Sequence, residues 1–313
     1  MNTVTSSVLN SLFSQRLDSY EGKEKIAETG AAYIRDRLRE TSFARKILPP
    51  EQVTKGDCQR SVSHDGLVKI IDIEPESYAM AINFRSQPDG RYVSASRYEI
   101  PFFPISSELF SKSEQELMAY EMPITKIIEQ NSVKDIQKIE DTVFLDYVLA
   151  AIKASHSAAK PKNVVDATKA TVTDKADIIK LFNMLVNDEL PVGVMLMTDS
   201  MLNNIMALDT VQLGEILGSE VFRDGYKYNT LMGRKLITTI KTDIVLPTEI
   251  FCFTEPDFFG KFFVLDNTKF YIDKRANMIE WRSWETIAIG LGNIRGADRI
   301  VFTNGGADPR ALI

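Results

Sequence analysis

The chain has 313 residues, of which 44% are hydrophobic and 26% are charged, and its formal net charge is −6. These values predict a globular protein that buries a substantial core in one elaborate domain or two connected ones, and they exclude a mostly disordered chain. The acidic balance also excludes a protein that binds nucleic acid over its whole surface, so any phosphate contact is expected to be local.

The cysteines and the apolar segments predict the compartment. Cys58 and Cys252 lie far apart without metal-ligand spacing, which excludes a disulfide scaffold and favours a reducing compartment, although a bridge between neighbouring chains stays open. The N-terminus lacks the charged start and apolar run of a secretory signal, and no segment is apolar over the length that a bilayer requires. We therefore expect a cytoplasmic product without membrane contact.

The N-terminal region is predicted to be an arm, residues 1–30, followed by a basic helix. The arm begins rich in Ser, Thr and Asn, and the helix is indicated by apolar residues at helical spacing, which are Ala27, Ala31, Ile34 and Leu38. Segment 35–46 has five basic and two acidic residues, a net charge of +3, and includes Arg35, Arg37 and Arg39. Its basic face is either solvated or turned toward phosphates.

A long hairpin is predicted after a strand at Leu67–Ile73. Residues alternate with strand period on both sides of the turn residues Pro88, Asp89 and Gly90, namely Tyr78, Met80, Ile82 and Phe84 before it and Tyr92, Tyr98, Ile100 and Phe102 after it. Two strands alone are marginally stable in water. The hairpin therefore needs support from its own chain or from another chain.

Helices are predicted in the middle of the chain. Capping and acidic residues predict a helix start within Ser106–Met122, and Pro123 interrupts it. A long helix to about Ser155 follows from the apolar stripe of Val133, Ile136, Ile139, Val143, Tyr147 and Ala150, which Phe144, Val148 and Ala151 widen. An Ala/Lys/Pro junction precedes a further helix over Asp174–Val186.

Strands dominate the rest of the sequence. Val192–Met197 is predicted as a buried strand that leads into a short helix capped by Thr198 or Asp199. From Leu231 onward, segments rich in β-branched and aromatic residues alternate with turn residues and end in a strand at Ile300–Phe302. Early helices and late strands predict an α+β fold.

Candidate catalytic residues and cofactor sites are not apparent. His64 and His156 have no further ligands at metal-binding spacing, and no phosphate-binding loop, nucleophile elbow or zinc-protease motif occurs. Gly290, Gly292 and Gly296 superficially match a dinucleotide fingerprint, but they follow a predicted strand without a helix, so a strand bend is the better interpretation. We therefore predict no catalytic residue, no cofactor and no metal.

Two further groups have structural interpretations. Glu140 and Asp141 are expected on a charged helix face, where solvation or ion pairing accounts for them. The aromatic run of Phe258, Phe259, Phe262 and Phe263 is expected in a core or an interface rather than in stacking on bases.

The predicted parts follow one another as a polar arm, a basic helix, a long hairpin, a long helix, a second α+β region and returning strands. This order resembles that of the major capsid proteins of tailed bacteriophages. These proteins share the fold first described for phage Hong Kong 97. The resemblance spans nearly the whole chain and includes the loose patterns NTLMGRKLITTI, EIFCFTEPDFFGKFFVLD and MIEWRSWETIAIGLGNIRGADRIVF.

The resemblance implies a division of the chain. After the arm, residues 31–66 contain the N-terminal helix and the start of a peripheral domain, and residues 67–105 form an extended loop that lies across a neighbouring subunit. Residues 106–162 complete the peripheral domain with its spine helix, residues 163–268 form an axial domain, and residues 269–313 return to the peripheral domain.

The resemblance also implies a function in assembly. Copies would form hexamers and pentamers of an icosahedral virion shell, assembled in the host cytoplasm around double-stranded DNA that is contacted weakly. A portal and separate scaffolding or decoration proteins would be further partners. The hairpin would contact the neighbour through Tyr78, Met80, Ile82, Phe84, Arg85, Arg91, Tyr92, Arg97 and Tyr98, and Arg35, Arg37 and Arg39 would face the shell interior.

Two other functions stay open. A shell protein of an encapsulin-like nanocompartment resembles the same fold and would enclose enzyme cargo in place of DNA. A soluble enzyme with a site near His64 and Asp65 is an alternative of a different class.

Overall fold

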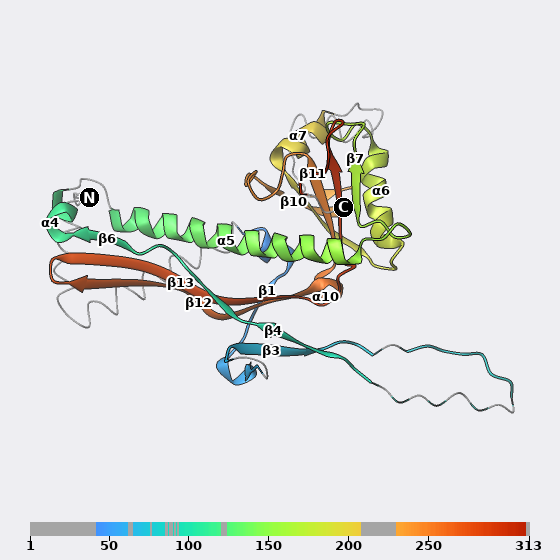
Figure 1. Cartoon of the computed structure of the whole chain (residues 1–313), viewed down its shortest axis with the longest axis horizontal. Coiled ribbons are helices and arrows are strands. Elements are labelled where there is room, and N and C mark those ends of the chain that lie inside the picture. Colours follow the sequence, from blue (N-terminus) through green and yellow to red (C-terminus); the bar gives the residue numbers. More distant parts are fainter. Residues whose placement is uncertain are drawn as a thin grey trace.

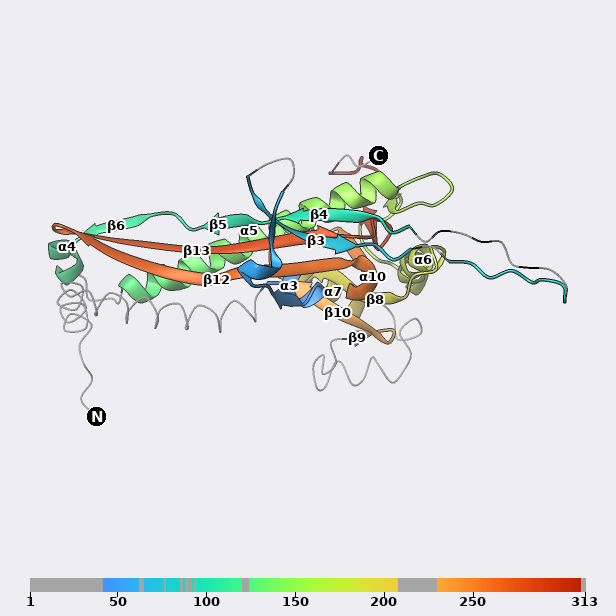
Figure 2. The same cartoon turned by 90° about the horizontal axis from the view of Figure 1, so that it is seen from below.

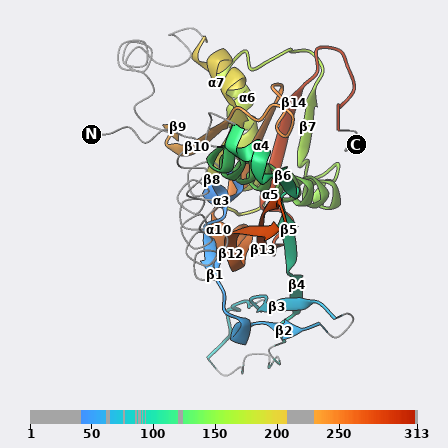
Figure 3. The same cartoon turned by 90° about the vertical axis from the view of Figure 1, so that its left-hand side faces the viewer.

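The computed structural model describes residues 42–61, 65–75, 77–84, 87, 90, 92, 94–119, 124–207 and 230–310. These residues form three sheets. Figure 3 shows the sheets as successive layers, with the six-stranded sheet at the top, the long β12 and β13 ribbon in the middle and the β2, β3 and β4 sheet at the bottom. The predicted α+β class is confirmed.

The central layer is a long antiparallel ribbon. β12 (Gly260–Arg275) and β13 (Met278–Leu291) pair along almost their whole length, and Ala276 adopts a left-handed conformation in the turn between them. β1 (Pro50–Gln52) adds to β12, while β5 (Phe103–Ser106) and β6 (Phe110–Ser113) add to β13. The ribbon is thus extended on both edges.

A single long helix covers one face of this ribbon. α5 (Ile124–Ser155) has 32 residues, which corresponds to about 48 Å of helix. Figures 1 and 2 show α5 running along the ribbon, with α4 (Glu114–Ala119) at the ribbon's far end. The predicted long helix that ends at about Ser155 is confirmed. The helix start predicted within Ser106–Met122 is confirmed as well, because α4 begins at Glu114, after residues 110–113 pair with β13 as β6.

The six-stranded sheet has the order β7, β14, β11, β8, β10, β9. Its strands are β7 (Asn163–Asp166), β8 (Val192–Thr198), β9 (Thr230–Leu231), β10 (Arg234–Thr239), β11 (Glu249–Thr254) and β14 (Ala297–Phe302). α6 (Lys175–Val186) and α7 (Asp199–Met206) pack on it, with Asp174 and Thr198 as N-caps. The predicted elements of this region are confirmed, and of the two proposed caps of α7 the structure has Thr198.

The third sheet contains β2 (Gln59–Arg60), β3 (Leu67–Asp72) and β4 (Arg97–Pro101), and a short 3-10 helix, Lys55–Asp57, precedes it.

Two short helices connect the layers, α3 (Ala44–Ile47) and α10 (Pro256–Phe259). None of the helices in the described part of the chain combines the length and hydropathy that crossing a bilayer requires.

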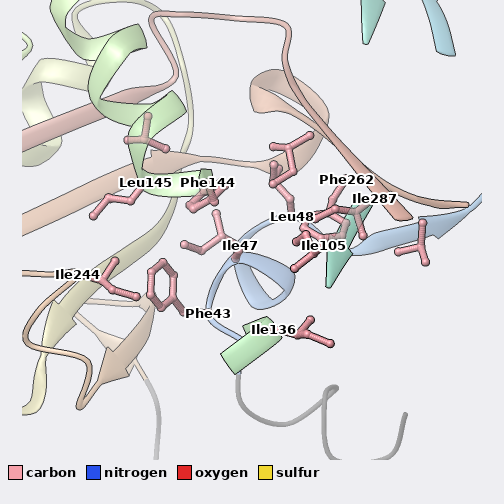
Figure 4. Close-up of a cluster of buried hydrophobic side chains, with 14 of the residues drawn as sticks. Phe43, Ile47, Leu48, Ile105, Ile136, Phe144, Leu145, Ile244, Phe262 and Ile287 are labelled. Carbon is pink, nitrogen blue, oxygen red and sulfur yellow. The ribbon is translucent and has the colours of Figure 1, made fainter. Parts of the chain in front are cut away.

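The main core joins the segments where α3, α5, the ribbon and the six-stranded sheet meet. Phe144 of α5 lies at its centre, with ring centroids 6.3 Å from Phe43, 5.9 Å from Phe253 and 6.5 Å from Phe259. Figure 4 shows Phe43 and Ile47 pointing toward the Phe144 side of this cluster and Leu48, Ile105, Phe262 and Ile287 gathering beside it. The ring of Phe144 therefore connects α5 with the segment before α3, with β11 of the six-stranded sheet and with α10.

The buried face of α5 differs from the predicted stripe. Val133, Ile136, Phe144 and Val148 are buried as expected, but Ile139 and Tyr147 are exposed. The buried face instead includes Gln137, Glu140 and Asp141. The apolar periodicity misplaced the stripe because it cannot anticipate polar side chains that find charged partners in distant segments.

Candidate assembly surface

An extended loop projects from the body of the molecule. The ladder between β3 and β4 runs from Val68 opposite Pro101 to Asp72 opposite Arg97, and the amide of Ile73 still donates to the carbonyl of Ser96 at 2.8 Å. Beyond this point the chain leaves the body and returns, as Figure 1 shows at its lower right. The predicted hairpin is thus confirmed at its base.

The loop carries apolar side chains that the described part of the chain leaves uncovered. Exposed fractions are 65% for Tyr78, 50% for Ile82, 113% for Phe84 and 98% for Tyr92, and Met80 is exposed as well. Monomeric proteins rarely present so many large apolar groups together without a partner. These five residues of the predicted contact surface therefore lie where a partner can reach them.

One detail of the hairpin prediction is wrong. The described residues between Ile73 and Ser96 belong to no strand, because no third strand or helix supports them there. The turn predicted at Pro88, Asp89 and Gly90 stays a prediction, because Pro88 and Asp89 lie outside the described residues.

The base of the hairpin is covered by its own chain. Ile100 is buried with Val53, Phe263 and Ala288, which places it in contact with the ribbon and not on a free face. A Cβ atom on Gly290 of β13 would lie 2.1 Å from Cδ1 of Ile100, so any larger residue would displace the Ile100 side chain where β4 crosses the ribbon. This close approach fixes the origin of the loop.

We expect Gly290→Ala to loosen the base of the loop. The added methyl group collides with Ile100, and overpacking of this kind costs about 1–3 kcal/mol. Thermal unfolding should show a lower Tm than that of the unmodified chain. Gly56→Ala is the matched control, because its Cβ meets no atom closer than 3.7 Å, and an equal Tm for the two variants would contradict the prediction.

A buried ion cluster holds the segment before the loop on the body. The Arg45 guanidinium donates to both oxygens of Glu140 at 2.9 and 2.8 Å and to both oxygens of Glu285 at 3.1 and 3.2 Å. The hydroxyl of Thr268 donates to Glu285 at 2.7 Å. Both carboxylates are fully buried, so of the two explanations offered for Glu140, solvation and ion pairing, the structure has ion pairing.

Two carboxyl groups with one arginine hold a proton between them. Burial raises the pKa of Glu285 to about 9, helped by the hydrogen bond and charge of Glu140. Burial opposes ionisation of Glu140 too, but hydrogen bonds from Glu285 and Arg45 outweigh it and lower the pKa of Glu140. At neutral pH the cluster therefore contains one arginine cation, one carboxylate and one carboxylic acid.

This proton makes stability depend on pH. The folded pKa of Glu285 lies above its unfolded value, so its contribution is complete below about pH 4.5 and is lost progressively as the pH rises toward 9. Glu285→Gln stays neutral at every pH. We expect the Tm of this variant, relative to the unmodified chain, to rise as the pH increases from 5 to about 9.

Thermal unfolding at several pH values checks this prediction. The exposed residue Glu108 provides the control variant, Glu108→Gln, whose Tm should keep a constant offset from that of the unmodified chain. A Tm difference for Glu285→Gln that stays constant from pH 5 to 9 would show that Glu285 binds no proton in the folded chain.

Asp141 ties a second pair of segments to α5. One of its oxygens accepts from the hydroxyl of Ser42 at 2.8 Å and from the amide of Ala44 at 3.0 Å, and the other lies 2.6 Å from the Lys241 ammonium. Lys138, one turn earlier on α5, pairs with Asp243. The loop between β10 and β11 is therefore fastened to α5 by two ion pairs.

The ribbon face opposite α5 presents an aromatic and cationic patch. The Tyr271 and Trp284 rings lie 6.0 Å apart, and the Arg282 guanidinium lies 5.1 Å from the Trp284 ring centroid. Tyr271 and Arg282 are exposed, whereas the alternate residues Phe270 and Trp281 are buried toward α5. Tyr, Trp and Arg are the residues most enriched at interface hot spots.

Several predicted site residues lie outside the described residues, namely Arg35, Arg37, Arg39, Arg85, Arg91 and His64. Two further residues predicted to contact a neighbouring subunit lie at the hairpin base. Tyr98 is half-buried, and Arg97 is exposed, with its Nε 2.7 Å from Oδ1 of its cross-strand neighbour Asp72. Their predicted contacts with a neighbouring subunit stay predictions.

The remaining candidate groups have structural roles. His156 accepts hydrogen bonds through Nδ1 from the amides of Lys162 and Asn163, at 3.1 and 3.2 Å. Phe259, Phe262 and Phe263 are buried as expected, while Phe258 is exposed. Within the described ranges, no group of three His, Cys, Asp or Glu side chains is arranged to hold a metal ion.

Comparisons with known proteins identify the fold. No protein-family model and no curated protein sequence matches the chain. Solved structures do match, including the mature capsid of bacteriophage PhiM1, with 11% identity, a TM-score of 0.55, and coverage of 84% of this chain and 88% of that chain. The capsid of cyanophage P-SCSP1u has 10% identity, a TM-score of 0.57, and coverage of 78% and 86%.

The capsid of cyanophage Pam1 gives a similar result, with 11% identity, a TM-score of 0.56, and coverage of 78% of this chain and 87% of that chain. The chain therefore has the fold of phage capsid proteins over most of its length. The resemblance predicted from the order of elements is confirmed at this level, although so little sequence identity remains that motifs alone could not have established it.

Proposed function

We propose that this protein is the major capsid protein of a tailed phage, and that its copies assemble into the hexamers and pentamers of an icosahedral head shell around double-stranded DNA. The fold supports this function, and the observation that carries it is the projecting loop. Its apolar side chains are exposed on a single chain, so they lower the free energy only when a second copy covers them.

The directions of the loop and the ribbon favour a head-to-tail contact. In Figure 1 the loop extends along the long axis away from the β3 and β4 base, and the turn between β12 and β13 lies at the opposite end. A loop that points away from its own ribbon reaches the ribbon of the next copy. Contacts between unlike surfaces form a closed ring when the rotation between neighbouring copies brings the last copy into contact with the first. Hexamers and pentamers are rings of this kind.

The patch of Tyr271, Arg282 and Trp284 is the surface we assign to the neighbour's loop. It lies on the ribbon face opposite α5, and Figure 1 shows the loop running on that same side of the ribbon. The patch offers aromatic rings to the loop's Tyr78 and Phe84 and a cation to its exposed Glu74. Such groups contribute most when a partner removes them from water.

The loop itself provides the direct test. Phe84→Ala combined with Tyr92→Ala removes two side chains that are almost fully exposed in the single chain, so the Tm of the subunit should not change. Loss of two buried rings at a contact costs about 1.5–3 kcal/mol each, which should reduce the yield of closed shells by more than about tenfold. Sedimentation and negative-stain images measure this yield.

Leu109→Ala is the matched control, because Leu109 is 58% exposed but lies outside the loop. Its shell yield should stay close to that of the unmodified chain. Normal shell yield from the Phe84 and Tyr92 variant would rule out the loop as an assembly contact.

The division of the chain follows from the proposed function. Residues 67–105 act as the extended loop, residues 106–162 with the long α5 as the peripheral domain, and residues 163–268 as an axial domain that meets its copies at the centre of each capsomer. Residues 269–313 return to the peripheral domain. The six-stranded sheet and the ribbon support this division as separate layers, although β12 begins at residue 260 and β14 pairs within the six-stranded sheet.

Contents of the shell distinguish the phage capsid from an encapsulin-like compartment. We expect purified particles from the native source to contain double-stranded DNA, held weakly because the chain is net acidic. Nuclease-treated particles should keep DNA that is released on denaturation. Particles that contain a protein cargo and no nucleic acid would support the encapsulin alternative.

Further partners belong to the same proposal. Arg35, Arg37 and Arg39 would line the inner surface and contact phosphates weakly, with binding that falls as salt rises. A portal and separate scaffolding or decoration proteins would complete the head.

A further inference from the structure

A buried lysine lies between two aspartates at the edge of the six-stranded sheet. The Lys162 ammonium is 2.5 Å from Oδ2 of Asp188 and 2.9 Å from Oδ1 of Asp298, and it donates to the carbonyl of Arg295 at 2.9 Å. The side chains of Lys162 and Asp188 are 1% exposed and that of Asp298 is fully buried. Lys160 pairs with the other oxygen of Asp188 at 2.7 Å.

The carboxylates of this cluster are unusual within the chain. Both oxygens of Asp298 and Oδ2 of Asp188 are buried and accept no hydrogen bond of acceptable geometry. In the Arg45 cluster, by contrast, both oxygens of Glu140 and of Glu285 accept hydrogen bonds, and both oxygens of Glu249 do so from Arg299 and Arg310. Buried carboxylate oxygens without such partners are rare and call for an explanation.

The strand register brings the amine and the carboxyl group together without strain. β7 and β14 are parallel neighbours in which Asn163 lies opposite Arg299, and the amide of Arg299 donates to the carbonyl of Lys162 at 2.9 Å. Lys162 and Asp298 directly precede Asn163 and Arg299 in the chain, so they occupy the preceding register position. Their side chains therefore share one face of the sheet, at a separation that a covalent link can span.

The protonation states suit a reaction between them. Burial raises the pKa of Asp298 to about 7, against the opposing charge of Lys162, so a large share of this group is a neutral carboxylic acid near neutral pH. Burial also opposes ionisation of Asp188, but Lys160 and Lys162 outweigh it and lower its pKa, which leaves Asp188 as a carboxylate beside the ammonium. An acid, an amine and a base are thus in contact.

We propose that Lys162 and Asp298 form an intramolecular amide bond within each chain. Asp188 accepts a proton from the ammonium, and the neutral amine attacks Cγ of Asp298. Asp188 then gives this proton to the departing hydroxyl group, takes up the second proton lost by the nitrogen and releases it to solvent. One C–N bond forms, one C–O bond breaks, one water leaves and one proton is released, with no oxidant or cofactor required.

The product relieves the local electrostatics. It removes the buried ammonium and one of the carboxyl groups, whose desolvation is costly. The neutral amide that remains can donate its N–H to the carbonyl of Arg295. The bond closes residues 163–297 into a loop and so restricts the unfolded chain. The bond joins the β7 and β14 segments at the edge of the six-stranded sheet covalently. We expect it to form whether or not the chain assembles with other copies.

The mass of the intact, denatured chain tests the proposal. We expect a loss of about 18 Da, one water, relative to the mass of the sequence. Trypsin should fail to cleave after Lys162 and should release a branched product in which the peptide Gly296–Arg299 is joined to the peptide that contains Lys162. The full sequence mass together with cleavage after Lys162, in protein stored for several days at neutral pH, would overturn the proposal.

Three variants separate this bond from other losses of water. Lys162→Arg keeps the cation but not the primary amine and should have its full sequence mass, whereas dehydration at Asp65–Gly66 or Asp89–Gly90 would persist in it. Asp298→Asn should lose about 17 Da, because ammonia leaves in place of water. Asp188→Asn removes the base and should retain its full mass, and a branched product from it would contradict the role of Asp188.

Discussion

Two neighbouring carboxylates on α5, Glu140 and Asp141, gather segments that are far apart in the sequence. Glu140 shares Arg45 with Glu285 of the ribbon, and Asp141 binds Ser42 on one side and Lys241 on the other. Removing one member of a buried ion pair leaves an uncompensated charge, which costs several kcal/mol. The relative position of the N-terminal anchor, the ribbon and the six-stranded sheet therefore depends on α5 carrying these two charges.

This anchoring places the projecting loop. The chain passes from α3 on α5 to β1 on the edge of β12, and then into the sheet from which the loop leaves. Ile100, seated against Gly290, fixes the returning arm on the ribbon. The loop consequently starts from a rigid base although its own middle is unsupported, and a rigid base reduces the entropy that is lost when a partner binds.

Sequence patterns predicted elements whose partners are local or whose periodicity is strong. The 32 residues of α5, the buried strand with Met195 and Met197, and the cap at Thr198 could all be found in this way. For Glu140 the sequence left solvation and ion pairing as alternatives and could not show that the side chain is buried, because its partners Arg45 and Glu285 lie 95 and 145 positions away. Nor could alternation alone show that Ile100 is buried while Tyr92 is exposed, since this depends on where the ribbon ends.

The exposed loop has little to gain from folding back onto the body of its own chain. Its large apolar residues, such as Tyr78, Met80 and Ile82, alternate with the small residues Ala79 and Ala81, so the arm offers few large side chains from which to form a core of its own. Folding back would also require the loop to reverse direction at its base, where Asp72 and Arg97 are paired and Ile73 is bonded to Ser96. A second chain can cover these side chains without breaking those bonds, and this makes intermolecular contact the lower-energy solution.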